Sequence, residues 1–334
     1  MRVIRMKVEQ IKVKDIVGRK LSRSNRMLVR EAYKRGVQFE ILPNKRFRMI
    51  QKDKKYLVSG GKISHSFNSK LAIKVTKYKD VTSRLLRNGG FPAPENYVFN
   101  KYELNRAWNW AQNILPVVLK PNDGTMGKHV YVKIDDYTEF KHCFQKIAEQ
   151  YDKVLVEKYI EGEEYRFTYV KGEIVAIANR IPANVIGDGV KTIRELVEEK
   201  NAERERRNNP IHKKLVLDEE SERVLKRQGF TFDSIPIEGV RVFLRNNSNV
   251  STGGDAVDVT DLIDENIKKQ VQLALKSIPG LRVCGADVLI SGESFHIIEI
   301  NTHPMLSMHH FPWEGKERDV IGKVIDAMFP NTVQ

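Results

Sequence analysis

The chain has few cysteines, no long apolar run and no low-complexity segment. Its 334 residues include two cysteines, Cys143 and Cys284, with no metal-type partner close in sequence. Two thiols cannot form the disulfide framework of a small secreted domain. No stretch approaches the ~20 uncharged apolar residues that a membrane span requires, and no apolar segment follows the basic start, as it would in a secretory signal. We therefore expect a cytoplasmic protein without a membrane partner.

Acidic residues are scarce in one part of the chain only. Residues 1–80 contain 23 Lys and Arg but 6 Asp and Glu, a net charge of +17, whereas the remainder carries −3. The excess indicates either a solvated, lysine-rich surface or a local field that attracts an acidic partner, such as a substrate or a nucleic acid. No RNA- or DNA-binding motif accompanies it, which disfavours nucleic acid.

Apolar periodicity predicts an α+β protein. Residues 116–120 (PVVLK) have the pattern of a buried strand, and residues 136–150 that of an amphipathic helix. The charged segment 192–207 begins with a capping box formed by Thr192 and Glu195. Most strands after residue 116 are joined by short turns, so we expect antiparallel hairpins there, preceded by a small α/β unit over residues 1–75.

The C-terminal hairpin places oxygen ligands on one face. Glu299 and Asn301 are two residues apart and therefore share a face of their strand. A turn centred near residue 293 brings Asp287 opposite Glu299. Two carboxylates and an amide oxygen suit Mg²⁺, which also takes ligands from phosphates. The alternative for this hairpin alone is an exposed polar face.

A lysine and a glycine-punctuated loop follow the strand at 116–120. Lys120 ends the strand, and the loop carries Gly124, Gly127 and Lys128. Glycines let backbone N–H groups approach an anion, and lysines supply positive charge. The loop is not a Walker A motif, because it leads into a strand rather than a helix. It is either a cover for phosphates or an ordinary turn.

A third segment combines an apolar strand with an acidic connection. Residues 154–164 (VLVEKYIEGEE) could offer backbone hydrogen bonds to adenine, and Glu164 a carboxylate to ribose. Alone, this segment is more typical of an ordinary charged turn. The order of the three features, a lysine strand with a glycine loop, then EKYIEGEE, then D-x11-E-x-N, resembles the ATP-grasp superfamily.

The resemblance extends over residues 67–330. Residues 176–189 (AIANRIPANVIGDG) and 248–261 (SNVSTGGDAVDVTD) are similar to the ATP-grasp module of cyanophycin synthetases and to the glutathione-synthetase module of bifunctional glutathione synthetases. The resemblance implies an ATP-grasp fold, in which two α+β subdomains clamp ATP. The implied division is a basic N-terminal unit over 1–75, a small subdomain with the glycine-rich flap over 76–160, and a large subdomain with the metal hairpin and substrate loops over 161–334.

The resemblance also implies roles for individual residues. Those expected to bind ATP are Lys79, Lys120, Gly124, Gly127, Lys128, Glu157, Lys158, Tyr159, Ile160 and Glu164. Those expected to hold two Mg²⁺ ions, with Mn²⁺ as an alternative metal, are Asp287, Glu299 and Asn301. Those expected to face the phosphates or an acyl-phosphate are Arg180, Arg245 and Asn249. Those expected to face substrate are Arg166, Ser251, Thr252, Gly253, Gly254 and His309.

The family activates a carboxylate as an acyl-phosphate, which an amine then attacks to form an amide. The chemistry requires positioning and charge neutralisation but no nucleophilic side chain. We therefore expect a ligase acting on amino acids or small peptides, acidic ones if the basic N-terminal unit contacts them. A phosphotransferase on the same scaffold and a non-enzymatic binder of an acidic partner are the alternatives. The sequence leaves open the substrates, polymerisation and oligomeric state, including a homodimer.

Two features near the metal hairpin have more than one interpretation. His309 either orients a substrate carboxylate, helps to deprotonate the amine, or is a structural histidine. The proline–glycine that follows the metal asparagine in the family is Pro304 and Met305 here, so the acceptor pocket is expected to differ in shape. Cys284 is expected to be a small core residue.

Overall fold

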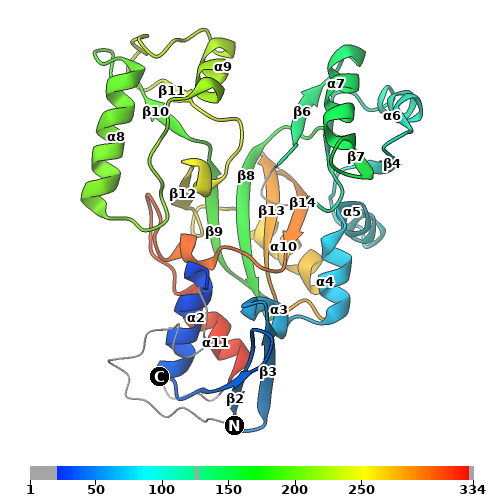
Figure 1. The fold of residues 1–334 in the computed structure, drawn as a ribbon, viewed down its shortest axis with the longest axis vertical. Helices are drawn as coiled ribbons and strands as arrows, with labels where there is room; N and C mark the ends of the chain where they lie inside the picture. Colours follow the sequence, from blue (N-terminus) through cyan, green and yellow to red (C-terminus); the bar gives the residue numbers. More distant parts are fainter. Residues whose placement is uncertain (1–20, 125–127, 331–334) are drawn as a thin grey trace. The chain divides into compact units, whose positions relative to one another are not determined.

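The computed structural model describes residues 21–124 and 128–330. Contacts between residues divide the chain into two compact units. The first comprises residues up to 177, 260–307 and 318 onward, and the second comprises 178–259 and 308–317. The division by sequence segment into 1–75, 76–160 and 161–334 stays a prediction. Figure 1 shows the elements of both units, which are described separately below.

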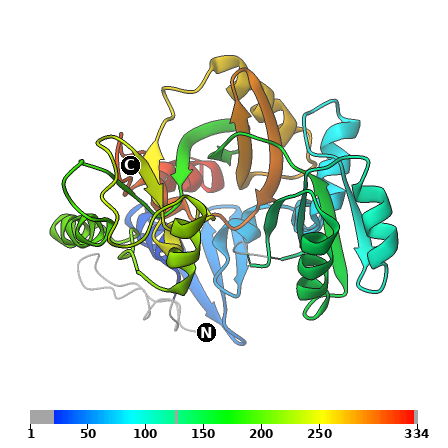
Figure 2. The ribbon, with the colours of Figure 1, turned by 90° about the horizontal axis from the view of Figure 1, so that it is seen from above.

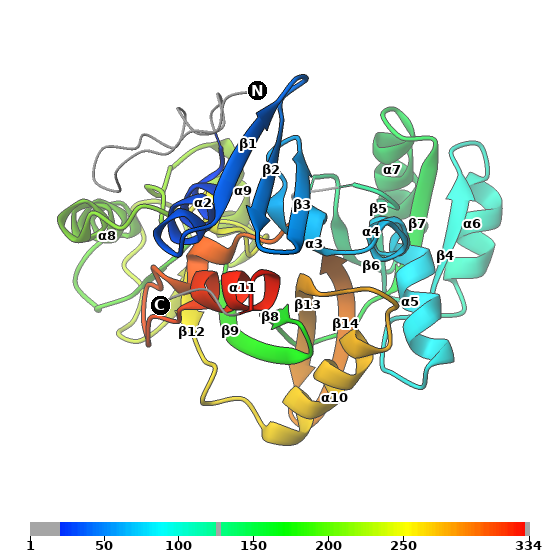
Figure 3. The same cartoon turned by 90° about the horizontal axis from the view of Figure 1, so that it is seen from below.

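The first unit begins with a helix and a three-stranded antiparallel sheet: α2 (Arg23–Lys34), β1 (Gln38–Leu42), β2 (Arg46–Gln51) and β3 (Lys54–Ser59). Phe47 and Met49 alternate on the buried face of β2. They share one core with α2 and with the last helix, α11 (Val320–Met328). Figure 3 shows both helices beside the three strands.

Three short helices follow, and then a four-stranded antiparallel sheet. The helices are α3 (Ile63–Phe67), α4 (Lys70–Lys77) and α5 (Lys79–Asn88). The sheet has the order β4-β7-β5-β6, made of β4 (Asn96–Asn100), β5 (Val117–Pro121), β6 (Tyr131–Ile134) and β7 (Lys153–Lys158). All five residues of β5 are buried, as the apolar run predicts.

Two helices, α6 (Leu104–Ala111) and α7 (Tyr137–Ala148), cover one face of this sheet (Figure 2). The helix α7 buries Phe140, Cys143, Phe144 and Ile147. Their spacing of three and four residues places them on one side of a helix, so the amphipathic helix predicted over 136–150 is confirmed.

The second sheet of the first unit contains β8 (Glu163–Val170), β13 (Val283–Ser291) and β14 (Ser294–Asn301) side by side, with α10 (Glu265–Lys276) packed against β14. The strand β9 (Glu173–Ile181) lies beside β8 and begins in this unit. The turn between β8 and β9 has Gly172 at φ +106°, a conformation that glycine adopts readily.

The second unit contains the end of β9, which pairs with β12 (Asp255–Asp258). It also contains the antiparallel pair β10 (Asn184–Ile186) and β11 (Arg241–Phe243), the helices α8 (Ile193–Arg207) and α9 (Glu219–Arg227), and a 3₁₀ turn over Val250–Thr252. The predicted capping box is present, since Thr192 accepts from the Glu195 N–H and Glu195 accepts from the Thr192 N–H. In the part of the chain that the structure describes, no helix is both long and apolar enough to cross a membrane.

Candidate functional site

The strand register of the first unit gathers the predicted metal residues. Asp287 lies opposite Glu299, and Gly285 opposite Asn301, in the β13–β14 pair. On the other side of β13, Arg166 of β8 lies opposite Asp287. Residues directly opposite one another in an antiparallel pair share a face. The expectation that the hairpin sets Asp287 across from Glu299 is therefore confirmed.

Arg166 and Asp287 form a buried bidentate ion pair. The Arg166 Nε and Nη2 atoms donate to the two Asp287 oxygens at 2.5 and 3.0 Å. Both side chains are nearly fully buried. Burial opposes the charge of Arg166, but the Asp287 carboxylate outweighs it and raises the guanidinium pKa. A Cβ at Gly285 would lie 2.7 Å from Arg166 Cδ, so this glycine leaves the space that the arginine occupies.

Lys79, the first residue of α5, links the glycine loop to β14. Its Nζ donates to the Gly124 carbonyl at 2.8 Å and lies 3.7 Å from Glu299 Oε1. The base of the flap is held by Asn122, which is buried. Asn122 accepts from the Asp80 N–H at 3.2 Å and donates to the Asp80 carboxylate at 2.7 Å. These hydrogen bonds attach the start of the glycine loop to the N-terminus of α5.

Lys120 and Glu157 form a second buried pair. The lysine Nζ lies 2.6 Å from Glu157 Oε1, and the two residues are 6% and 3% exposed. Asn96 of β4 donates to the other carboxylate oxygen at 3.1 Å. The sequence predicts Glu157 beside adenine, and the structure adds a contact that this prediction does not include. Through that contact Glu157 compensates the charge of the predicted phosphate-binding lysine.

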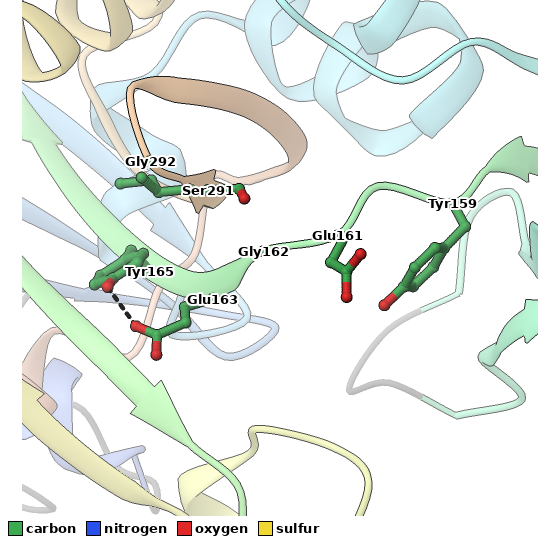
Figure 4. Close-up of a pocket in the computed structure, with 8 residues that line it drawn as sticks. Tyr159, Glu161, Gly162, Glu163, Tyr165, Ser291 and Gly292 are labelled. Carbon is green, nitrogen blue, oxygen red and sulfur yellow. Dashed lines mark hydrogen bonds between the residues drawn. The ribbon is translucent and has the colours of Figure 1, made fainter.

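The segment after β7 lines an open hollow of about 570 Å³ (Figure 4). The backbone N–H groups of Lys158 and Tyr159 donate to Glu95 and Pro116 within the chain, at 2.8 and 2.9 Å. The Tyr165 hydroxyl donates to Glu163 at 2.6 Å. The hollow is lined by Tyr159, Glu161, Gly162, Glu163, Tyr165, Ile290, Ser291 and Gly292. Glu163 and Tyr165 alternate with Glu164 and Arg166 along β8, so they face the other side of the sheet.

The remaining predicted residues belong to the second unit. Arg245 is 8% exposed and donates to Asp218 at 2.7 Å. Together with Arg227 and Asn246 it lines a hollow of about 310 Å³. Arg180 lies on β9, within its pairing with β12, Asn249 directly precedes the 3₁₀ turn, and His309 is buried.

Residues 251–254 form a tight turn at the end of this 3₁₀ segment. The N–H groups of Thr252 and Gly254 both donate to the Asn249 carbonyl, at 3.1 and 3.0 Å. Gly253 has φ +98°, and a Cβ at Gly254 would lie 2.8 Å from the Ile181 oxygen. The two glycines are therefore required by backbone geometry. Of the flap, Gly127 lies outside the described residues, and Lys128 is exposed.

The oxygen donors fit a magnesium ion that shares its ligands with phosphates. Asp287, Glu299 and Asn301 offer hard oxygen atoms on one face. The side chain of Glu299 is 37% exposed, while Asn301 Oδ1 accepts from the His303 N–H at 2.8 Å. Among the described residues no group of three or more His, Cys, Asp or Glu could hold a metal by itself. A closed protein cage is thus absent there, and a partly hydrated ion held with phosphate is the suitable occupant.

Residues 76–305 match a family model described as ATP-grasp domain, which is more than half of the chain. The chain belongs to the ATP-grasp family, and the predicted α+β ATP-grasp fold is confirmed. Among curated proteins, it is 34% identical over 328 residues to the glutathione biosynthesis bifunctional protein of Mannheimia succiniciproducens, covering 93% of this chain and 43% of that protein. It is also 34% identical over 324 residues to the cyanophycin synthetase of Trichormus variabilis, covering 93% and 35%.

A solved relative has a similar fold. The crystal structure of a bifunctional glutathione synthetase from Pasteurella multocida matches with a TM-score of 0.66 and 31% identity, over 93% of this chain and 44% of that chain. The chain thus spans less than half of the length of these relatives. Both family resemblances stated from the sequence are confirmed.

Proposed function

We propose that the chain is an ATP-dependent carboxylate–amine ligase, which forms an amide and releases ADP and phosphate. The observation that carries the proposal is the face of β8, β13 and β14, where Asp287 and Glu299 lie opposite each other with Lys79 3.7 Å from Glu299. Membership of the ATP-grasp family and the names of the relatives, a glutathione biosynthesis protein and a cyanophycin synthetase, support it.

The residues of the first unit would bind and neutralise the triphosphate. Lys79 and Lys120 supply positive charge, and the flap with Gly124, Gly127 and Lys128 covers the phosphates. Residues 157–160 hold adenine and Glu164 the ribose. The side chains are preorganised by their ion pairs and hydrogen bonds, so little reorganisation is needed when charge develops on the transferred phosphoryl group.

Asp287, Glu299 and Asn301 would hold two Mg²⁺ ions, or Mn²⁺ in their place. When bound, these ions neutralise phosphate charge and polarise the γ-phosphoryl group towards a carboxylate oxygen. The chain itself places the oxygen donors on one rigid hairpin. Arg166 orients Asp287 by donating to both of its oxygens.

The second unit and Arg166 would provide the substrate contacts. Arg180, Arg245 and Asn249 carry positive charge or amide groups suited to an acyl-phosphate, and residues 251–254 and His309 contact the substrates. We propose amino acids or small peptides as substrates, acidic ones if the basic N-terminal unit contacts them. We also propose that the chain forms a homodimer and is located in the cytoplasm.

The test is ADP release from the purified chain with MgATP and pairs of amino acids or small peptides, with mass spectrometry of the products. We expect release that requires both a carboxylate and an amine, and a product heavier than the carboxylate by the amine minus water. ADP release with a phosphorylated product that needs no amine would instead identify a phosphotransferase. No ADP release with any pair, from a protein that binds nucleotide, would overturn the proposal.

A further inference from the structure

Helix α8 carries a buried arginine, Arg204, and a partly buried lysine, Lys200, which share one carboxylate. In the second unit, Lys200 Nζ and Arg204 Nη2 each lie 2.6 Å from one oxygen of Asp255. Asn184 donates to Asp255 as well, at 3.1 Å. Arg204 and Asp255 are each 3% exposed. A buried carboxylate with three donors is held rigidly, because moving a charged donor away would leave the charge of the carboxylate uncompensated.

Arg204 also donates to two backbone carbonyl groups from different segments of the second unit. Its Nη2 atom donates to the Gly253 carbonyl at 2.9 Å, and its Nη1 atom donates to the Lys213 carbonyl. One nitrogen therefore bridges Gly253 and Asp255, which flank Gly254. A lysine in this position could reach the carboxylate but could not match the planar fork of the guanidinium.

An aromatic side chain covers this cluster. The Arg207 and Arg204 guanidinium carbons lie 4.1 and 5.6 Å from the centre of the Trp313 ring. Trp313 is itself tied to β12, because its N–H donates to the Ala256 carbonyl at 2.7 Å. Stacking on an aromatic face stabilises a guanidinium and excludes water from it. The cluster is thus anchored to the strand that follows the turn.

We propose that Arg204 is a positioning residue, which holds residues 251–254 in the conformation that contacts the substrate. The inference rests on the proposed function, since that function assigns these residues to substrate binding. The turn is closed from within by hydrogen bonds from Thr252 and Gly254 to Asn249. Arg204 fixes it from outside through the Gly253 carbonyl. It acts through the turn and touches no reacting atom itself.

The test compares Arg204→Lys with Arg206→Met as a matched control. Arg206 lies on the same helix, its side chain is 75% exposed, and it pairs with Glu203. Arg204→Lys keeps the charge beside Asp255, which protects the fold, but loses the bond to Gly253. We expect about a tenfold rise in KM for the carboxylate or amine substrate, with kcat and the ATP dissociation constant close to wild type. Arg206→Met should leave all three unchanged.

Hydrogen–deuterium exchange provides a measurement that does not depend on turnover. In Arg204→Lys the amides of residues 252–254 should exchange faster than in wild type and in Arg206→Met, while the first unit exchanges as before. Exchange equal to that of Arg206→Met, or an unchanged KM for both substrates, would overturn the inference. If no substrate pair supports ADP release, the proposed function fails, and exchange still decides whether Arg204 fixes the turn.

Discussion

The Nζ atom of Lys120 lies 2.6 Å from Oε1 of Glu157, and neither side chain is more than 7% exposed. Removing one partner of such a pair leaves a buried charge uncompensated, which costs about 3–5 kcal/mol. We therefore expect Lys120→Met and Glu157→Met each to lower the melting temperature strongly.

The double variant Lys120→Met/Glu157→Met separates stability from turnover. It should regain most of the lost stability, because well-packed apolar groups often replace a buried ion pair at no cost, yet it should remain inactive in ADP release. The exposed pair Lys101 and Asp152 is the control, for which one substitution should cost about 1 kcal/mol or less. A double variant that is active would contradict the phosphate-binding role of Lys120.

Glu299→Gln should abolish most turnover without unfolding the protein. The side chain is partly exposed and faces Lys79 at 3.7 Å, so its loss removes charge from the proposed metal face rather than from a core. We expect ADP release to fall by about 10²–10³-fold, as for other groups that stabilise transition-state charge. Glu293→Gln, in the exposed turn of the same hairpin, should behave like wild type. A Glu299→Gln protein with normal turnover would refute the metal assignment.

Gly285→Ala should disturb Asp287 through its neighbour. The added methyl group would lie 2.7 Å from Arg166 Cδ and 3.0 Å from Pro304 Cβ, so Arg166 must shift. Such overpacking costs about 1–3 kcal/mol, and turnover should fall about as far as in Arg166→Met. Because both changes act on the same ion pair, the double variant should show little further loss. Fully additive losses would show that Gly285 acts independently of Arg166.

The second unit should lose stability in mild acid because of His212. Burial lowers the pKa of this histidine to about 4, and its Nε2 accepts from the Ala256 N–H at 3.1 Å. The unfolded chain, with a histidine pKa of about 6.5, binds a proton first as the pH falls. The contribution of His212 is therefore complete above about pH 6.5 and decreases towards pH 4, by up to about 1.4 kcal/mol per pH unit.

Denaturant midpoints between pH 7.5 and 4.5 measure this effect. Replacement of the histidine by glutamine, His212→Gln, keeps an acceptor for the Ala256 N–H and removes the titration. Its stability should change less steeply over the same range. An equal slope in wild type and variant would assign the acid sensitivity to other groups.

The parts of the site that could be predicted from sequence lie close together along the chain. A short hairpin turn fixes which residues are opposite, so the pairing of Asp287 with Glu299 follows from counting. The contact between Lys120 and Glu157 could not be predicted in this way. It depends on the register of β5 against β7, which the packing of the whole sheet determines. For the same reason, the sequence alone does not identify Asn96, Asn122 and Asp80 as contacts of the site.

The helix α8 shows a second limit of prediction from the sequence. Its sequence, IRELVEEKNAERERR, is charged at ten of fifteen positions, a composition typical of a solvated helix. Arg204 is nevertheless buried and Lys200, four residues earlier, is partly buried, because Asp255 and the carbonyls around it compensate their charges. The carboxylate that makes this burial favourable lies 51 residues from Arg204 in sequence.

The two buried thiols lie in the cores of two sheets of the first unit, so each thiol can report the local unfolding of one sheet. Cys143 lies on the buried face of α7, where burial raises its pKa to about 11. Cys284 is buried in β13, where burial also raises its pKa. A reagent that reacts with thiolates will modify neither in the native state. Labelling kinetics followed by peptide mass analysis would therefore show whether the sheet covered by α6 and α7 and the sheet that contains β13 and β14 open together or one before the other.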